Sequence, residues 1–135
     1  MNTLFTVGTK LSVEDKLITQ EHINQYAIAS DDDNPLHINP EFAKTTMFGG
    51  TIAHGLLSAA FLNEMMIKYF GNNWETSGDI SIAFLSPVRP GDVIKTTGTV
   101  IEASDQGHIT MEIQCMNQNE KKVIAGQASV TIPAE

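Results

Sequence analysis

Apolar residues recur at helical spacing in two stretches of the first half of the chain. The first stretch, residues 20–30 (QEHINQYAIAS), follows Thr19, a residue type that favours the N-cap position of a helix. This spacing predicts a helix with core-facing positions at Ile23, Tyr26, Ala27, Ala29 and Ser30. We expect the Asn34-Pro35 pair to stop any helix beyond it, because the residue before a proline is pushed out of the α region.

The second stretch, residues 54–70 (HGLLSAAFLNEMMIKYF), is apolar at most positions. Asn63, Glu64 and Lys68 form one narrow polar edge, so we expect a long buried helix that ends at residues 71–73. Between the two stretches, Asn39 and Pro40 suit the cap and first position of a short helix over residues 40–46.

The period changes to two in the C-terminal part of the chain. Alternating apolar positions predict strands over residues 79–88, 92–104, 108–118 and 122–132, with hairpin-type connections at 105–107 and 117–121. Residues 3–19 predict one short strand and a loop, or two short strands. The order of elements indicates an α+β fold, in which an antiparallel sheet wraps around one long central helix.

Composition narrows the class of protein. The 135 residues, with 41% hydrophobic and 18% charged positions and no repeat or linker, fit a single domain over residues 1–135. The net charge of −8 and the scattering of the 8 Lys and Arg residues argue against nucleic acid and anionic membranes as partners. The chain shows neither a signal peptide nor a long apolar span, so we expect a cytoplasmic protein. Cys115 is the one cysteine, which excludes an internal disulfide and suggests a buried thiol.

The stretch from Asp31 to Pro40, DDDNPLHINP, carries the densest chemistry in the chain. On the residues alone, two interpretations remain open. The acids and Asn34 could form an Asx-type surface turn. Alternatively, the turn at Pro35 could bring Asp32 and His37 to one point, where a carboxylate and an imidazole form an acid/base pair.

A second candidate element lies at the start of the long helix. Backbone N–H groups at a helix N-terminus attract developing oxyanions, and a glycine such as Gly55 lets a ligand approach them closely. The alternative is that Gly49, Gly50 and Gly55 only shape a loop. We interpret His54 as a helix-start or packing histidine rather than a catalytic one.

Other conspicuous side chains have structural interpretations. His22, His108 and Arg89 are expected at the surface, whereas Trp74, Met65 and Met66 are expected to fill the core or an interface. No third ligand stands at recognisable spacing from Asp32 and His37, so we expect no metal site.

In combination, these segments resemble the MaoC-like (R)-specific enoyl-CoA hydratases, also called hydratase 2, which have the hotdog fold. The signature of that family, an Asp-x-Asn-Pro-Leu/Ile-His run, stands here as Asp32-Asp33-Asn34-Pro35-Leu36-His37. It is followed by Asn39-Pro40-Glu41-Phe42-Ala43, then by GGTIAHGLL at residues 49–57 and by FLSPVRPGD at residues 84–92. The resemblance extends over residues 5–133.

The resemblance implies an activity and a set of site residues. Members of the family add water to trans-2-enoyl thioesters of coenzyme A or acyl carrier protein to give (R)-3-hydroxyacyl thioesters, or remove it. By motif position, Asp32 and His37 would bracket a water, Asn34 would orient the site, and the Gly55 N–H would donate to the thioester carbonyl. Asp31 and Asp33 would be solvated neighbours.

Some relatives carry a serine near the sixth position after the helix-start histidine. In this chain that position is Ala60, and Ser58 is the possible substrate contact. The resemblance further implies a homodimer that needs no metal or redox cofactor. A hotdog thioesterase and a non-catalytic acyl-CoA-binding subunit are the alternatives.

Overall fold

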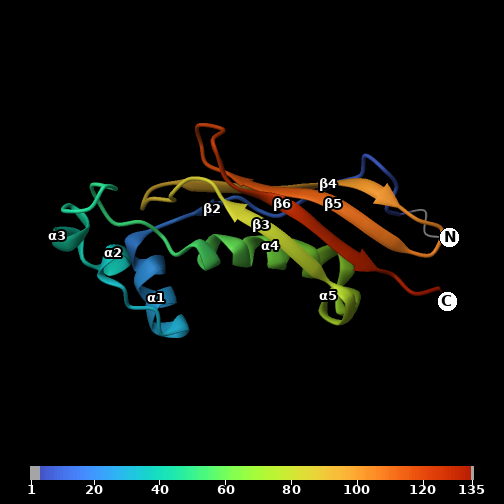
Figure 1. Ribbon diagram of the computed structural model, residues 1–135, viewed down its shortest axis with the longest axis horizontal. Coiled ribbons are helices and arrows are strands. Elements are labelled where there is room, and N and C mark those ends of the chain that lie inside the picture. The colour runs from blue at the N-terminus through green and yellow to red at the C-terminus, as the bar shows by residue number, and fades with distance from the viewer. Residues whose placement is uncertain (1–3, 135) are drawn as a thin grey trace.

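The protein is described from a computed structural model, and the description extends over residues 4–134. Two short N-terminal strands are followed by a helical segment and then by four strands (Figure 1). The elements in chain order are β1 (Lys10–Ser12), β2 (Lys16–Leu17), α1 (Gln20–Ser30), α2 (Pro35–Ile38), α3 (Pro40–Ala43), α4 (Gly55–Phe70), α5 (Asn72–Ser77), β3 (Asp79–Phe84), β4 (Val93–Ala103), β5 (His108–Met116) and β6 (Lys122–Thr131).

The strands form one antiparallel sheet in the order β1-β4-β5-β6-β3, and β2 adds to β4 outside this path. The four predicted C-terminal strands are therefore confirmed, and the N-terminal region takes the two-strand alternative. β3 is an edge strand that pairs with β6 alone among the described strands. Helix α4 runs along one face of the sheet, whereas α1, α2 and α3 gather at one end of it and α5 at the other (Figure 1).

The long helix is held by alternate side chains of the central strands. On β5 the buried positions alternate with more exposed ones, as the period-two pattern predicted, and they are Ile109, Met111, Ile113 and Cys115. The helix contributes Leu62, Met65 and Met66, none of which is exposed to solvent. A side chain at Gly98 on β4 would lie 3.2 Å from the Met65 Cε, so the glycine allows the helix to sit close to the sheet.

Helix α1 starts as predicted, because the Thr19 hydroxyl accepts a hydrogen bond from the His22 N–H at 3.1 Å. Ile23 and Ala27 are buried, and Tyr26 is half-buried. The predicted core positions Ala29 and Ser30 are wrong, because the last turn of α1 projects beyond the core and both residues are exposed.

No helix runs through the Asn34-Pro35 pair, as predicted: α1 ends at Ser30, and Asn34 has non-helical angles (φ −51°, ψ 127°). The sequence pattern missed the short helix that begins at Pro35. Pro35 opens the short helix α2, since its missing N–H costs nothing at the first helical position, and Asn34 caps this helix. Helix α3 begins at Pro40 as predicted, but it ends at Ala43 rather than at residue 46. Helix α4 ends at Phe70 with Gly71 as its C-cap, but the expected break over residues 71–73 is shorter, because α5 starts at Asn72.

Two apolar surfaces remain open to solvent. Helix α4 is not buried all round: Leu56 is 66% exposed and Ile67 is 42% exposed. The edge strand β3 carries exposed apolar residues too, among them Ile80 and Phe84. Within residues 4–134, none of the helices has both the length and the apolar character that a membrane crossing requires.

Candidate active site

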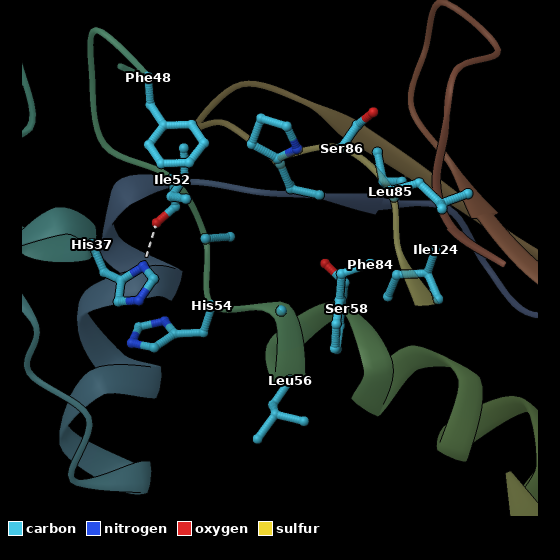
Figure 2. A pocket seen from close by; sticks show the side chains of 15 residues that line it. His37, Phe48, Ile52, His54, Leu56, Ser58, Phe84, Leu85, Ser86 and Ile124 are labelled. Atoms are coloured by element: carbon cyan, nitrogen blue, oxygen red, sulfur yellow. Dashed lines mark hydrogen bonds between the residues drawn. The ribbon is translucent and has the colours of Figure 1, made fainter. Parts of the chain in front are cut away.

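The helical segments at one end of the sheet surround the N-terminus of α4 and border a cavity of about 490 Å³ (Figures 1 and 2). His37 reaches this cavity from α2, and His54, Gly55 and Ser58 reach it from the start of α4. Phe84 at the end of β3 lines the cavity as well. The structure therefore brings together residues that lie far apart in the sequence.

The turn that carries Asp32 is built by its own side chains. Asp31, in the left-handed conformation with φ 58°, ends α1 and reverses the chain. The Asp32 carboxylate accepts a long bond of 3.4 Å from the Asn34 N–H, and the Asn34 side-chain oxygen caps the Leu36 N–H at 2.9 Å. The Asx-turn interpretation is therefore correct, and it is compatible with the acid/base interpretation. Asp31 and Asp33 are both exposed.

His37 is held in one orientation by the backbone. Its Nδ1 lies 2.8 Å from the carbonyl oxygen of Ile52 (Figure 2). Because a carbonyl can only accept, Nδ1 carries the proton in the neutral ring and the lone pair is left on Nε2. One carboxylate oxygen of Asp32 and one ring nitrogen each of His37 and His54 all lie within 4.8 Å of one another. A single water can bridge groups at such separations.

The sequence reasoning missed the position of His54. It is 3% exposed, and its ring stacks on His37 with centroids 3.9 Å apart and planes at 25°. Its Nε2 lies 2.9 Å from the carbonyl oxygen of Asp32. The interpretation as a packing histidine is correct in that the ring is buried, but the ring packs against the two candidate catalytic residues themselves.

The three side chains Asp32, His37 and His54 also meet the distance condition for a metal site. Their arrangement does not suit an ion, because an imidazole lone pair lies in the plane of its ring. A metal ion bound by both rings would have to lie in the planes of both. The rings of His37 and His54 are stacked with centroids 3.9 Å apart and planes at 25°, so the two planes intersect far from the rings. A zinc ion, in contrast, lies about 2.0–2.1 Å from each nitrogen that binds it. The stack instead suits a carboxylate–imidazole site.

Gly55 is the first residue of α4, so its N–H has no carbonyl one turn earlier within the helix. A side chain is sterically excluded at this position, because a Cβ would lie 2.7 Å from the Cε1 atom of the Phe84 ring. The glycine therefore does more than shape a loop: it allows the ring of Phe84 to lie against the helix start. Gly55 lines the cavity, and its N–H has no hydrogen-bond partner among residues 4–134.

Ser58 lies one turn further along α4 and lines the same cavity. It is 1% exposed, and its Oγ has no hydrogen-bond partner among the described residues. A buried unpaired hydroxyl costs about 1–3 kcal/mol, so such a group at a cavity wall suggests a bound partner. Figure 2 shows the Ser58 oxygen pointing toward the cavity, whereas the Ala60 side of the helix is exposed.

The remaining predicted side chains are where their types suggested. His22, His108 and Arg89 are exposed. Met65, Met66 and Trp74 are buried, and the Trp74 Nε1–H donates to the side-chain oxygen of Asn63 at 2.7 Å. Cys115 is buried beneath the site, and this burial raises the pKa of its thiol.

Comparison with known proteins gives consistent matches. The family model described as "MaoC like domain" matches residues 4–127. An (R)-specific enoyl-CoA hydratase from Rhodospirillum rubrum is 36% identical over 120 residues, which are 88% of this chain and 83% of that protein. A mitochondrial 3-hydroxyacyl-[acyl-carrier-protein] dehydratase from Arabidopsis thaliana is 33% identical over 135 residues, which are 97% of this chain and 80% of that protein.

A solved structure matches the whole fold. It is an (R)-hydratase from Aeromonas caviae involved in PHA biosynthesis, with a TM-score of 0.86 and 27% sequence identity. The match covers 98% of this chain and 100% of that one. The fold is thus the hotdog fold expected from the sequence.

Proposed function

Since the chain belongs to the MaoC-like domain family, we propose that it is an (R)-specific hydratase/dehydratase of 2-enoyl thioesters. It adds water to a trans-2-enoyl thioester to give the (R)-3-hydroxyacyl thioester, or catalyses the reverse reaction. The relatives named above include one that acts on a CoA thioester and one that acts on a carrier-protein thioester. The acyl carrier of this chain is accordingly coenzyme A or acyl carrier protein.

One observation carries the proposal: an imidazole with a free Nε2 and a helix N-terminus line one apolar cavity, and a carboxylate lies beside that imidazole. Asp32 supplies the carboxylate and His37 the imidazole, within 4.8 Å of each other. Gly55 supplies the N–H. This is the set of groups that hydration of a conjugated thioester requires.

The chemistry follows from this arrangement. The Gly55 N–H donates to the thioester carbonyl, which makes C3 electrophilic and stabilises the enolate that forms. A water held between Asp32 and His37 loses a proton to the pair as its oxygen bonds to C3. A proton from the same pair is delivered to C2, so the double bond is consumed and one water is added.

Two further residues support this site in the proposal. Asn34 caps α2, the helix that carries His37, and so fixes the distance between His37 and the turn of Asp32. The free Ser58 hydroxyl donates to an oxygen of the bound thioester, which gives its buried Oγ a partner. Neither role requires a metal or redox cofactor, and dialysis against a chelator should leave the rate unchanged.

The activity is tested by following the loss of enoyl absorbance of crotonyl-CoA in the ultraviolet. We expect the wild type to turn over, and both Asp32→Asn and His37→Ala to lose at least about 100-fold in kcat. Asp33→Asn and His22→Gln serve as matched controls, since both residues are exposed and should retain the wild-type rate. Chiral chromatography of the product should give the (R)-3-hydroxybutyryl group.

Other outcomes point to the alternatives. Release of free thiol from a saturated acyl-CoA would indicate a thioesterase. Binding of thioesters of every chain length without turnover would indicate a non-catalytic subunit. The preferred acyl carrier is identified by comparing the hydration rates of crotonyl-CoA and crotonyl-acyl carrier protein.

The proposed assembly is a homodimer formed across β3 and the open face of α4. The edge strand presents unpaired backbone groups together with Ile80 and Phe84, and α4 presents Leu56 and Ile67 beside it. A second copy would cover these surfaces. Because Phe84 also lines the cavity, the site would lie near the subunit interface.

Light scattering at micromolar concentration tests the dimer, whose mass would be twice the 14.7 kDa of the chain. Ile67→Lys should shift the equilibrium toward monomer. Ile28→Lys is the matched control, because Ile28 is 83% exposed on α1, away from the proposed interface. A wild type that stays monomeric would refute this part of the proposal.

A further inference from the structure

We propose that His54 is the positioning residue of the candidate catalytic pair, holding Asp32 through its ring N–H and His37 through its ring face. The inference deepens the proposed function, and the interpretation of the kinetic experiment below rests on that function. It assigns a role to a histidine that lies outside the Asp-x-Asn-Pro-Leu/Ile-His run. It stands on two contacts of one imidazole ring and on the backbone link from that residue to Gly55.

The first contact fixes the Asp32 segment. The His54 Nε2 lies 2.9 Å from the Asp32 carbonyl oxygen, and because that oxygen only accepts, the Nε2 carries the proton. The other local support for Asp32 is weak: its N–H reaches the Ser30 Oγ at 3.3 Å, and its carboxylate accepts from Asn34 at 3.4 Å. The His54 bond is thus the shortest of these three hydrogen bonds of Asp32, and it joins an exposed turn to a buried ring.

The second contact fixes the ring of His37. His54 stacks on it with a centroid distance of 3.9 Å, and Tyr26 in turn packs against His54 with a centroid distance of 4.8 Å and an interplanar angle of 58°. His37 has one in-plane anchor, the bond from Nδ1 to Ile52. An in-plane bond still allows the ring to tilt, whereas a stacked neighbour prevents this tilt.

The third link is covalent. His54 directly precedes Gly55 and is the N-cap residue of α4, although its side chain makes no capping bond there. Its ring is therefore free to face Asp32 and His37 while its backbone sets the position of the Gly55 N–H. One residue connects the three groups that the reaction needs. Its Nδ1 is buried without a partner among the described residues, so the bond from Nε2 to Asp32 is the hydrogen bond that orients the ring there.

Two substitutions separate the two contacts of the ring. His54→Phe keeps an aromatic ring beneath His37 and removes the donor to Asp32. His54→Gln keeps an N–H donor of similar reach and removes the ring. The control is His108→Gln, in which an exposed histidine at the start of β5 is replaced.

We expect each His54 variant to lose about 10- to 100-fold in kcat for the hydration of crotonyl-CoA, with KM within about threefold, because small displacements of catalytic groups cost this much. His108→Gln should keep both constants. All measurements are made well below the melting temperature of each variant. Wild-type kcat in both folded variants, or a change confined to KM, would overturn the proposal.

A measurement on the wild type keeps the proposal testable if a variant fails to fold or if the chain hydrates no thioester. Nitrogen-15 shifts of the imidazoles report which ring nitrogen carries the proton. We expect the Nε2–H form for His54 and the Nδ1–H form for His37. A proton on the Nδ1 of His54 in the neutral ring would remove the bond to Asp32 and overturn the proposal, whatever the activity of the protein.

Discussion

Replacing Gly55 with alanine adds one methyl group at the point where the proposed oxyanion donor meets the cavity. The new Cβ would lie 2.7 Å and 2.9 Å from two atoms of the Phe84 ring, whereas ordinary contacts begin near 3.4 Å. The ring therefore has to move by about 0.7 Å. Phe84 is outside the buried core and lines the cavity, so its ring can shift toward the cavity rather than strain the core.

The structure predicts that Gly55→Ala has a small effect on stability and a large effect on activity. Overpacking a closed core costs about 1–3 kcal/mol, but a ring that can shift toward the cavity should keep the loss below about 1 kcal/mol, or roughly 4 °C in Tm. The methyl group points back along the helix axis toward its N-terminus, the direction in which the N–H must meet a carbonyl oxygen. Losing one such donor costs about 100- to 1,000-fold in kcat, or about 2.7–4 kcal/mol.

The assay pairs thermal unfolding with the absorbance assay on crotonyl-CoA and includes two comparisons. Gly50→Ala is the matched control, since a Cβ there would lie 3.7 Å from the Arg89 guanidinium, an ordinary contact. The double variant Gly55→Ala with Phe84→Ala removes the clash but keeps the methyl group, so we expect it to stay inactive. A Gly55→Ala protein that retains kcat/KM within threefold of wild type would refute the assigned approach of the thioester to this N–H.

Three more predictions concern single side chains of the site and its surroundings. Asp32→Asn should reduce kcat by about 100- to 10,000-fold, whereas Asp31→Asn, on the neighbouring exposed carboxylate, should stay within about twofold in the same assay. Ser58→Ala removes a buried hydroxyl that has no partner among the described residues, so urea unfolding should show unchanged or higher stability, while KM for the thioester rises. A decrease of more than about 2 kcal/mol in the free energy of unfolding would contradict the view that this Oγ is unpaired. Burial raises the pKa of the Cys115 thiol, which lowers its thiolate fraction at any given pH, so a thiol reagent at mildly alkaline pH should label the native protein negligibly and the urea-unfolded protein fully.

The parts of the fold that the sequence predicted are those set by local chemistry. Thr19 and Asn39 mark helix starts because their side chains accept hydrogen bonds from the first turn, and the structure contains both bonds. The alternation along β5 places Cys115 inside because successive side chains point to opposite faces. These features need no knowledge of distant residues.

The errors arise where one local signal has two consequences or where the tertiary arrangement decides. Pro35 keeps Asn34 out of the helical region, as predicted, but it is itself well suited to the first helical position, and with Asn34 as the cap it opens α2. Ala29 has the spacing of a core residue, but it is exposed, because the described residues do not cover this end of α1. Spacing along a helix shows which residues share a face and not how far the core extends beneath it.

The same limit explains why His54 looked like an ordinary packing residue. It lies 22 positions from Asp32 and 17 from His37 in the sequence, and no local pattern relates the three. Their contact depends on α2 and the start of α4 meeting at one end of the sheet, where the bonds from His37 to Ile52 and from His54 to Asp32 cross between the two segments. Because each bond uses one nitrogen of its ring, the pair of contacts also sets both tautomers, and it leaves the Nε2 lone pair of His37 for the reaction. The tautomer of His37 that the chemistry needs is therefore set by the tertiary arrangement, and it could be inferred only once both carbonyl partners were known.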